Sequence, residues 1–365
     1  MSPLRAAAGL ALLCLGAACT RHDADFGSVG AFVPRDTAFL DASRPADTLR
    51  VATLNMSVGF PVSQLLFTDM ANPETAYLTL TAIYERYLQT RANDRIGAMA
   101  RAIDSLDLDV VGLQEVLSFK RDGVEVNDYL RELIDSIEAI GGPAYTVLSI
   151  PLNDTVLAGA KDGNSIRIDF REGNALLINP GFTVLDTARF PYYNVFSLTG
   201  SAATKSDRSL GYARIRTPKG AVWQVYTTHL EVFADISSNQ AAELVKFQQA
   251  HEVRKGGKTA APQVILADLN ADPGEGAHRI LEDAGFSDTY DSLAGLPHAT
   301  CCVAGSALWN PDAAFSERRI DYIMARHWVK TAEYGTALRY PLTTGDGARL
   351  LASDHRMVHA VLVGQ

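Results

Sequence analysis

The sequence Gln263-Val264-Ile265-Leu266-Ala267-Asp268-Leu269-Asn270 decides the expected fold. A short apolar run that contains β-branched residues predicts a buried strand. Side chains two positions apart on a strand point to the same side, so Asp268 and Asn270 are expected to project together from the strand end. A carboxylate beside a carboxamide can bind a phosphate, a water molecule or a hard metal ion, although Asp and Asn are also common in turns.

Other strand-like runs in the chain also carry polar residues at one end. These residues are Asn55, Glu115, His229, Asp321, Asp354 and His355. Each has an ordinary structural interpretation, such as a solvent-facing acid or a hydrogen-bonded histidine. A Glu that closes an apolar strand is nevertheless costly to bury unless it is paired or bound to a metal. The set as a whole therefore indicates a functional site.

Helical spacing of apolar residues predicts helices at Arg91–Asp107, Asn127–Ile140 and Ser238–Val253. These segments alternate with the strands, which predicts an α/β domain. The aromatic-rich segment Met56–Thr90 is expected to be a partly helical insertion that covers the core, with a lid or a lipid-facing surface as the alternative. Leu152–Arg167 is expected to be a polar loop.

Composition limits the classes of function. The chain has 365 residues, 47% hydrophobic and 21% charged, which is typical of a globular protein with one large or two ordinary domains. Its formal net charge of −9 argues against broad non-specific binding of nucleic acid, which needs a basic face. That charge does not exclude a phosphate substrate bridged by a metal.

The N-terminus has the pattern of an export signal. Residues 1–18 combine an early arginine with an apolar run too short to span a bilayer, and the end of this run resembles a bacterial lipobox with Cys19 as the lipidated residue. Gly16 departs from that motif, so ordinary secretion with cleavage after Ala18 is the alternative. We expect a membrane-anchored lipoprotein, in the periplasm or on the cell surface, in which residues 19–48 form a flexible tether to a catalytic domain at 49–365.

Beyond Cys19, the expected mature chain contains only the adjacent pair Cys301 and Cys302. Neighbouring cysteines can form only a strained ring disulfide, and no larger disulfide framework is implied. Both a joined pair and two packed thiols are compatible with the sequence.

The polar strand ends supply the groups needed to hydrolyse a phosphate ester with water. Carboxylate and amide oxygens are ligands for a hard divalent ion such as Mg²⁺, and His229 and His355 can transfer protons. The sequence lacks the Cys/His cluster of a structural zinc site and has no glycine-rich phosphate loop.

In this order the pieces resemble the endonuclease/exonuclease/phosphatase family, which has the deoxyribonuclease-I-like fold. The matching pieces are Thr53-Leu54-Asn55, Gly112-Leu113-Gln114-Glu115-Val116, Gly173-Asn174-Ala175-Leu176-Leu177, Thr228-His229-Leu230, Ala267-Asp268-Leu269-Asn270, Arg319-Ile320-Asp321-Tyr322-Ile323 and Ser353-Asp354-His355. Ala267, Leu269 and Met357 stand where the family commonly has Gly, Phe and Pro, but they replace no catalytic position. The resemblance implies an α/β fold, a four-layer α/β/β/α sandwich with the site at one rim.

The resemblance also implies roles for the residues. Glu115, with Asn55 nearby, would hold Mg²⁺, with Mn²⁺ or Ca²⁺ as alternatives. His355, polarised by either Asp321 or Asp354, would activate water, and Asp268 would orient that water. Asn270 and His229 would bind phosphoryl oxygens.

Two further residues are supporting candidates. Glu172 would orient His229 or be an exposed strand residue, and Arg208 would contact phosphate or be solvated at the surface.

The expected activity is that of a Mg²⁺-dependent phosphodiesterase, a phosphoric ester hydrolase, acting on nucleic acid or on a phospholipid headgroup. One alternative is a phosphomonoesterase on inositol-type or other small phosphate esters. Another is a catalytically inactive surface lipoprotein that binds a partner. The protein is expected to be a monomer attached to the membrane through its lipid anchor. The fold alone does not identify the substrate.

Overall fold

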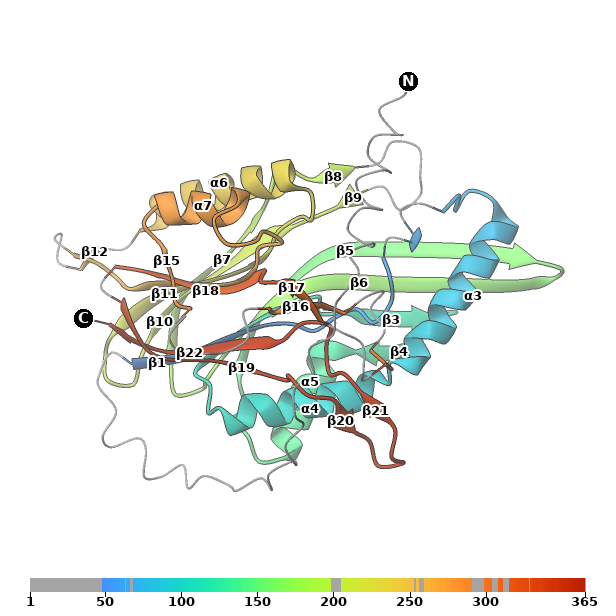
Figure 1. Ribbon diagram of the computed structural model, residues 1–365, viewed down its shortest axis with the longest axis horizontal. Coiled ribbons are helices and arrows are strands. Elements are labelled where there is room, and N and C mark those ends of the chain that lie inside the picture. The colour runs from blue at the N-terminus through green and yellow to red at the C-terminus, as the bar shows by residue number, and fades with distance from the viewer. Residues whose placement is uncertain are drawn as a thin grey trace. The chain divides into compact units, whose positions relative to one another are not determined.

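The computed structural model describes residues 48–62, 64–65, 68–197, 205–252, 254–255, 259–290, 299–303, 308–310, 315–327 and 329–364. Two large β-sheets pack face to face, and helices cover their outer faces (Figure 1). This arrangement confirms the expected four-layer α/β/β/α sandwich.

The first sheet has eight strands. They are β1 (Thr48–Asn55), β2 (Val110–Gln114), β3 (Ser118–Arg121), β4 (Val124–Asp128), β5 (Thr146–Lys161), β6 (Asn164–Ile178), β19 (Val329–Ala337) and β22 (Met357–Gly364). Their order is β19-β22-β1-β2-β6-β3-β4, and β5 also pairs with β6.

The second sheet has six strands in the order β15-β18-β14-β11-β10-β7. They are β7 (Thr183–Pro191), β10 (Ser209–Arg216), β11 (Val222–His229), β14 (Gln263–Asp268), β15 (Ser287–Asp288) and β18 (Asp321–Arg326). Short two-stranded ribbons complete the β-structure: β8 (Phe196–Ser197) with β9 (Lys205–Ser206), β12 (Arg254–Lys255) with β13 (Thr259–Ala260), β16 (Cys301–Val303) with β17 (Phe315–Arg318), and β20 (Leu342–Thr343) with β21 (Arg349–Leu350).

Helices bury the outer faces of both sheets. The first sheet is covered by α3 (Pro73–Gln89), α4 (Ala92–Ser105) and α5 (Tyr129–Ala139), and the second by α6 (Ala234–His251) and α7 (Gly276–Asp283). Apolar residues of the two sheets form a third cluster between them, which includes Val51, Leu176, Trp223, Val264 and Leu266. The central strands are therefore buried on both faces, which explains their continuous apolar sequences.

Gly112 lies where the two sheets approach each other closely. A Cβ atom at this position would lie 2.6 Å from Leu266 Cβ and 2.9 Å from Thr227 Oγ1. Only glycine therefore fits on β2 at this point. The close approach brings the end of β2 next to β11 and β14 of the other sheet.

Strand direction gathers the polar ends at one rim. β1 is parallel to β2, and β11 is parallel to β14, so the carboxyl ends of each pair share an edge. β18 and β22 run antiparallel to their neighbours β14 and β1, which brings the beginnings of these two strands to the same edges.

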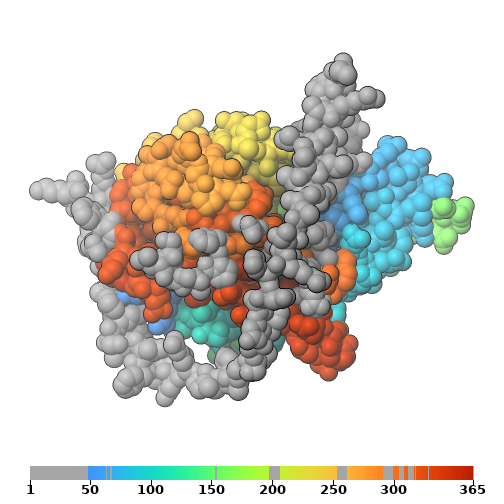
Figure 2. Space-filling view, in the orientation of Figure 1, coloured from blue at the N-terminus to red at the C-terminus, as the bar shows by residue number. Residues whose placement is uncertain are grey.

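The segment Leu152–Arg167 is not a loop, and this expectation was wrong. It forms the end nearest the turn of a long hairpin in which β5 and β6 pair from Thr146↔Ile178 to Lys161↔Asn164. The turn contains Asp162 at φ 51° and Gly163 at φ 80°, and an Asp-Gly pair with positive φ is typical of a tight hairpin. Figure 2 shows the green tip of this hairpin emerging beyond the light-blue surface of α3.

The insertion Met56–Thr90 is partly helical and packs on the core, as its favoured interpretation predicted. Its helix α3 begins after Asn72, whose side chain accepts hydrogen bonds from the backbone N–H groups of Glu74 and Thr75. Residues Ala76, Leu80, Ile83 and Tyr87 are buried. The insertion therefore covers the β5–β6 hairpin with one apolar face.

The expected signal peptide, Cys19 and the tether up to residue 47 lie outside the described residues. Within the described part of the chain, no helix is both long enough and apolar enough to cross a bilayer.

Candidate active site

Strand register sets three ionisable side chains next to one another in the second sheet. His229 on β11 pairs with Asp268 on β14, and Asp268 pairs in turn with Asp321 on β18. All three are buried, with side-chain exposures of 4%, 1% and 0%. Adjacent strands are about 4.8 Å apart, so these side chains lie close enough to share hydrogen bonds or a ligand.

Two site residues adopt a left-handed backbone conformation directly after their strands. Glu115 follows β2 with φ 53°, and Asn270 lies two residues beyond β14 with φ 51°. Asn tolerates this conformation, whereas for Glu it costs of order 1 kcal/mol or more and requires support from its surroundings. Glu115 receives such support, because its Oε2 accepts from Val58 N at 2.8 Å and its Oε1 accepts from Asn55 Nδ2 at 3.0 Å.

His355 is held by Asp321 across the gap between the sheets. Its Nδ1 lies 2.9 Å from Asp321 Oδ2 and 3.1 Å from Oδ1, and 3.8 Å from Asp268 Oδ2. Of the two acids that could polarise His355, Asp321 is therefore the one in contact with Nδ1. Asp354 is half-buried beside it and acts on the site through its charge.

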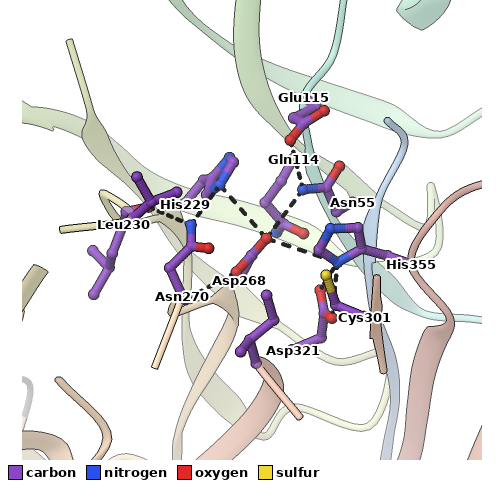
Figure 3. A network of polar contacts seen from close by, with 12 residues as sticks. Asn55, Gln114, Glu115, His229, Leu230, Asp268, Asn270, Cys301, Asp321 and His355 are labelled. Atoms are coloured by element: carbon purple, nitrogen blue, oxygen red, sulfur yellow. Dashed lines mark hydrogen bonds and ion pairs between the residues drawn. The ribbon is translucent and has the colours of Figure 1, made fainter. Parts of the chain in front are cut away.

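Asn55 joins the two sheets through its side chain (Figure 3). Its Nδ2 donates to Glu115 Oε1 at 3.0 Å and to Asp268 Oδ2 at 3.0 Å, while its Oδ1 accepts from Ser57 N at 2.9 Å. The amide thereby fixes the positions of the two carboxylates. Since the Glu115 carboxylate carries charge and has more lone pairs than the Asn55 amide oxygen, Glu115 is the stronger of the two predicted metal ligands.

His229 lies between a cation and an amide. Its Nδ1 is 2.8 Å from Arg208 Nη1, and its Nε2 is 3.0 Å from Asn270 Nδ2 and 3.5 Å from Asp268 Oδ2. Arg208 Nη1 also donates to Glu172 Oε1 at 3.2 Å. Arg208 is thus buried rather than solvated at the surface, and Glu172 reaches His229 only through it.

The two histidines experience opposite electrostatic environments. Burial together with the Arg208 cation moves the pKa of His229 well below its ordinary value. Burial would also lower the pKa of His355, but the charge and hydrogen bond of Asp321, helped by Asp268, move it well above its ordinary value. Groups of the same type with pKa values pushed apart are characteristic of acid–base sites.

Two carboxylates of the site retain their protons more readily than usual. Burial and the negative charges of Glu172 and Asp354 raise the pKa of Glu115 to about 7. Burial and the charge of Asp321 raise the pKa of Asp268 to about 6. The site therefore holds more negative groups than its own cations neutralise, which is the condition under which a divalent cation binds favourably.

Cys301 and Cys302 border the site. Their side chains are joined as a disulfide, Cys301 forms an isolated β-bridge with His355, and Cys302 Sγ lies 4.0 Å from His355 Nε2. The pair therefore forms part of the wall beside the histidine ring.

A cleft of about 160 Å³ lies beside the site. One side of the cleft is formed by three residues of β6, Glu172, Gly173 and Asn174. Another side is formed by Val116 and Ser118, which follow Glu115. Asp128, Ser149 and Arg171 add further polar groups. The cleft is large enough for a small polar group of a substrate.

Several residues that position the site were not predicted from the sequence. Gln114 spans the sheets, because its Nε2 lies 3.2 Å from Thr227 Oγ1 while its Oε1 accepts from Thr53. Ser353 Oγ donates to Asn55 O and accepts from His355 N. Both residues lie inside the motifs quoted above, which was the available signal.

Arg95 and Thr300 complete this supporting shell. Arg95 Nη2 donates to the carbonyls of Met56 and Ser57, directly after Asn55. Thr300 Oγ1 accepts from the backbone N–H groups of Ile320 and Asp321. Arg95 shares the buried face of α4 with Ile96 and Met99, and this position was the only sequence signal of its burial.

The structure thus brings Asn55, Glu115, His229, Asp268, Asn270, Asp321, Asp354 and His355 to one rim, and it places Arg208 and Glu172 behind His229. Among the described residues, possible metal-ligand atoms of Asp268, Asp321 and His355 also lie within 4.8 Å of one another. The arrangement provides carboxylates for a cation, a histidine able to accept a proton, and donors for an anionic oxygen.

Comparisons with known proteins place this geometry in context. The model of the Endonuclease/Exonuclease/phosphatase family matches residues 52–355. No functionally curated protein matches the chain by sequence.

Solved structures with the same fold include an endonuclease/exonuclease/phosphatase family protein from Bacteroides thetaiotaomicron, with 17% identity over 87% of this chain and 98% of that one and a TM-score of 0.55. A mannosyl-6-phosphatase from the same organism has 17% identity over 86% and 99%, with a TM-score of 0.53. The human Nocturnin catalytic domain, solved with a bound sulfate anion, has 15% identity over 87% and 94%, with a TM-score of 0.51.

Proposed function

The chain belongs to the endonuclease/exonuclease/phosphatase family, whose members hydrolyse phosphate esters, and from that premise we propose that it is a divalent-metal-dependent phosphodiesterase. The observation that carries this proposal is the His355–Asp321 pair, which faces Asp268 and the Asn55–Glu115 pair across one rim. A proton acceptor next to an acidic cation site is what water needs in order to attack a phosphorus atom.

A divalent cation fits the residues that are present. Glu115 is the candidate ligand, with Asn55 beside it. The negative charges of Glu172 and Asp354 lie near its carboxylate, and a bound cation would offset them. Magnesium prefers such oxygen ligands, and Mn²⁺ and Ca²⁺ accept the same donors. When bound, the ion supplies positive charge that offsets the charge of the phosphate.

The protein's own residues divide the remaining work. His355, oriented by Asp321 through Nδ1, takes a proton from water at Nε2. Asp268 helps to orient that water. Asn270 and His229 donate hydrogen bonds to phosphoryl oxygens, whose charge increases in the transition state. Preorganised donors of this kind are each worth about 10²–10³ in rate.

Phosphomonoester hydrolysis is a second candidate, and one observation favours it. The 160 Å³ cleft beside Glu115 carries Asp128 and Glu172 as well as Ser118 and Ser149. Carboxylates and hydroxyls in a small cleft suit a compact hydroxylated leaving group better than a polyanionic backbone. One solved structure with the same fold is a mannosyl-6-phosphatase.

The test compares ester classes on one preparation. The purified domain is assayed with plasmid DNA, sphingomyelin, bis-p-nitrophenyl phosphate and sugar phosphates, with Mg²⁺ or with EDTA, alongside His355→Ala. We expect Mg²⁺-dependent cleavage of a diester that falls by at least about 10²-fold in the variant. Cleavage of monoesters alone would assign the second candidate. Absence of activity on every ester, in a folded protein, would favour a binding lipoprotein and contradict both enzymatic proposals.

We also propose that the protein is exported and anchored through Cys19, and that it acts as a monomer. The apolar run before Cys19 supports the first part. Cys19→Ala should move the protein from the membrane fraction to the soluble fraction, and an unchanged distribution would contradict the lipid anchor.

A further inference from the structure

The neighbours of His229 restrict which of its ring nitrogens can carry the proton. Arg208 Nη1 is 2.8 Å from Nδ1, and Asn270 Nδ2 is 3.0 Å from Nε2. Both neighbouring atoms are hydrogen-bond donors. A neutral imidazole has one N–H and one lone pair, so it can accept only one of these two hydrogen bonds.

Arg208 is the stronger competitor for the lone pair. Its guanidinium stays protonated and can only donate, whereas Asn270 Nδ2 already donates to Leu230 O at 2.9 Å. A ring N–H directed at a guanidinium would place two positive hydrogens together inside the protein. The lone pair of His229 therefore belongs on Nδ1 and its proton on Nε2, next to Asp268 Oδ2 at 3.5 Å. Asn270 Nδ2, which lies 3.0 Å from Nε2, then donates to Leu230 O and not to the ring.

Arg208 is itself held rigidly. Its side chain is 10% exposed and lies between two carboxylates, Glu172 at 3.2 Å from Nη1 and Glu231 at 3.8 Å from Nε. Glu231 is positioned in turn, because its Oε1 accepts from Val232 N and its own N–H donates to Gln240. One buried acid, Glu231, and one partly buried acid, Glu172, keep the guanidinium directed at His229 instead of at solvent.

We propose that Arg208 is a positioning residue that fixes His229 as the neutral tautomer with its proton on Nε2. This makes His229 a permanent hydrogen-bond donor to a phosphoryl oxygen, and it leaves His355 as the histidine that exchanges protons. The inference rests on the proposed phosphoesterase function for its catalytic consequence, but the tautomer itself is a property of the free protein.

Long-range ¹H–¹⁵N NMR of histidine-labelled protein measures the tautomer directly. The two ring nitrogens of a neutral histidine differ in ¹⁵N shift according to which one carries the proton. The chain has eight histidines, and His229→Gln identifies the signals of His229. We expect a protonated Nε2 and an unprotonated Nδ1 in the wild type. A proton on Nδ1 would overturn the proposal, since Asn270 would then be the donor to the ring.

Variants of Arg208 test whether this residue determines the tautomer of His229. Arg208→Met removes the donor and should shift the ring toward a mixture of tautomers, with kcat about 10²-fold lower. Arg208→Lys keeps a donor-only cation and should restore the Nε2–H tautomer and part of the activity. Arg214→Met is the matched control, an arginine on β10 that is 3.9 Å from Asp186, and it should change neither readout.

The outcomes separate the two proposals. Unchanged His229 signals in both Arg208 variants would overturn the role of Arg208, whatever the activity. The expected tautomer in a wild-type protein that cleaves no phosphate ester would contradict the proposed function and leave the assignment of the proton intact. If Arg208→Met does not fold, the wild-type spectrum still tests the proposal, because a proton on Nδ1 would overturn it.

Discussion

His355 directs its Nδ1 at Asp321, 2.9 Å from Oδ2 and 3.1 Å from Oδ1, although Asp321 begins β18 of the second sheet and His355 precedes β22 of the first. This contact orients the ring and leaves Nε2 as the nitrogen that can take a proton from water. The neighbouring His229 is instead held by a cation, Arg208. The two histidines thus differ in role because one faces an anion and the other a guanidinium.

Replacement of the acid beside His355 separates Asp321 from Asp354. Asp321→Asn removes the charge in contact with Nδ1 and should lower kcat by about 10²–10⁴-fold, the range for loss of general base function. Asp354→Asn removes a charge that contributes less than Asp321 to the pKa of His355 and should have a smaller effect. Steady-state kinetics of both variants on the best substrate provide the comparison. Equal losses, or a larger loss in Asp354→Asn, would contradict Asp321 as the direct partner.

The pH profile should report on the same pair. His355 accepts a proton only when it is neutral, and its pKa lies well above the ordinary value of 6.5 because of Asp321 and Asp268 despite burial. The rate should therefore rise with pH as His355 loses its proton, with a midpoint above 6.5.

Asp321→Asn should move this rising limb to lower pH, because the anion that stabilises the imidazolium is gone. The measurement is kcat/KM against pH for the wild type and the variant. A limb that stays in place would show that another group controls the profile.

Much of this site could be predicted from the sequence, for reasons visible in single residues. Asp268 and Asp321 end and begin strands, and parallel or antiparallel pairing brings such ends to one edge. The fold could be predicted because both of its signals can be read along the chain. These signals are the strands that are apolar on both faces and the order of the motifs. The hairpin at Leu152–Arg167 was missed because its many polar residues alternate with few buried apolar ones, such as Leu157 and Ile166, and polarity was given more weight than the Asp162-Gly163 turn.

Contacts between distant segments could not be predicted. The sequence left Asp321 and Asp354 as equal partners of His355, and only the relative position of the two sheets distinguishes them. It also left open whether Glu172 orients His229 or is an exposed strand residue, whereas Arg208 stands between Glu172 and His229. Which side chains meet across the interface depends on how the two sheets pack against each other. The spacing of residues along the chain does not give this packing.

Cation binding should be detectable without any substrate. Glu115 has a pKa of about 7, so below that pH a proton competes with the cation for its carboxylate. Mg²⁺ should therefore raise the melting temperature more at pH 8 than at pH 6. A ligand at a hundred times its Kd adds about 2.7 kcal/mol to the free energy of unfolding. Thermal denaturation with Mg²⁺ or EDTA at both pH values measures this shift.

Glu115→Gln should abolish the Mg²⁺-dependent shift, because the amide keeps the shape but not the charge of the side chain. Glu138→Gln, on the exposed face of α5, is the control and should retain it. A shift that survives in Glu115→Gln would assign the cation to other residues, such as the group formed by Asp268, Asp321 and His355.

Gly112 should be intolerant of any side chain, because it sets the distance between the sheets. In Gly112→Ala the new Cβ would meet Leu266 Cβ at 2.6 Å and Thr227 Oγ1 at 2.9 Å, so the sheets must separate or shift. Overpacking of this kind costs about 1–3 kcal/mol of stability. The end of β2 would move with it, and activity should fall even at temperatures where the variant is folded, since Gln114 and Glu115 follow directly.

Gly97→Ala is the matched control for this change. Gly97 lies within α4, and an added Cβ would have only Arg101 Nη1 nearby, at 3.5 Å. Alanine in a helix interior is favoured over glycine by roughly 0.5–1 kcal/mol, so this variant should be slightly more stable than the wild type and equally active. Denaturant unfolding and activity of both variants give the answer. A Gly112→Ala protein as stable and active as Gly97→Ala would mean that the sheet spacing does not position the site.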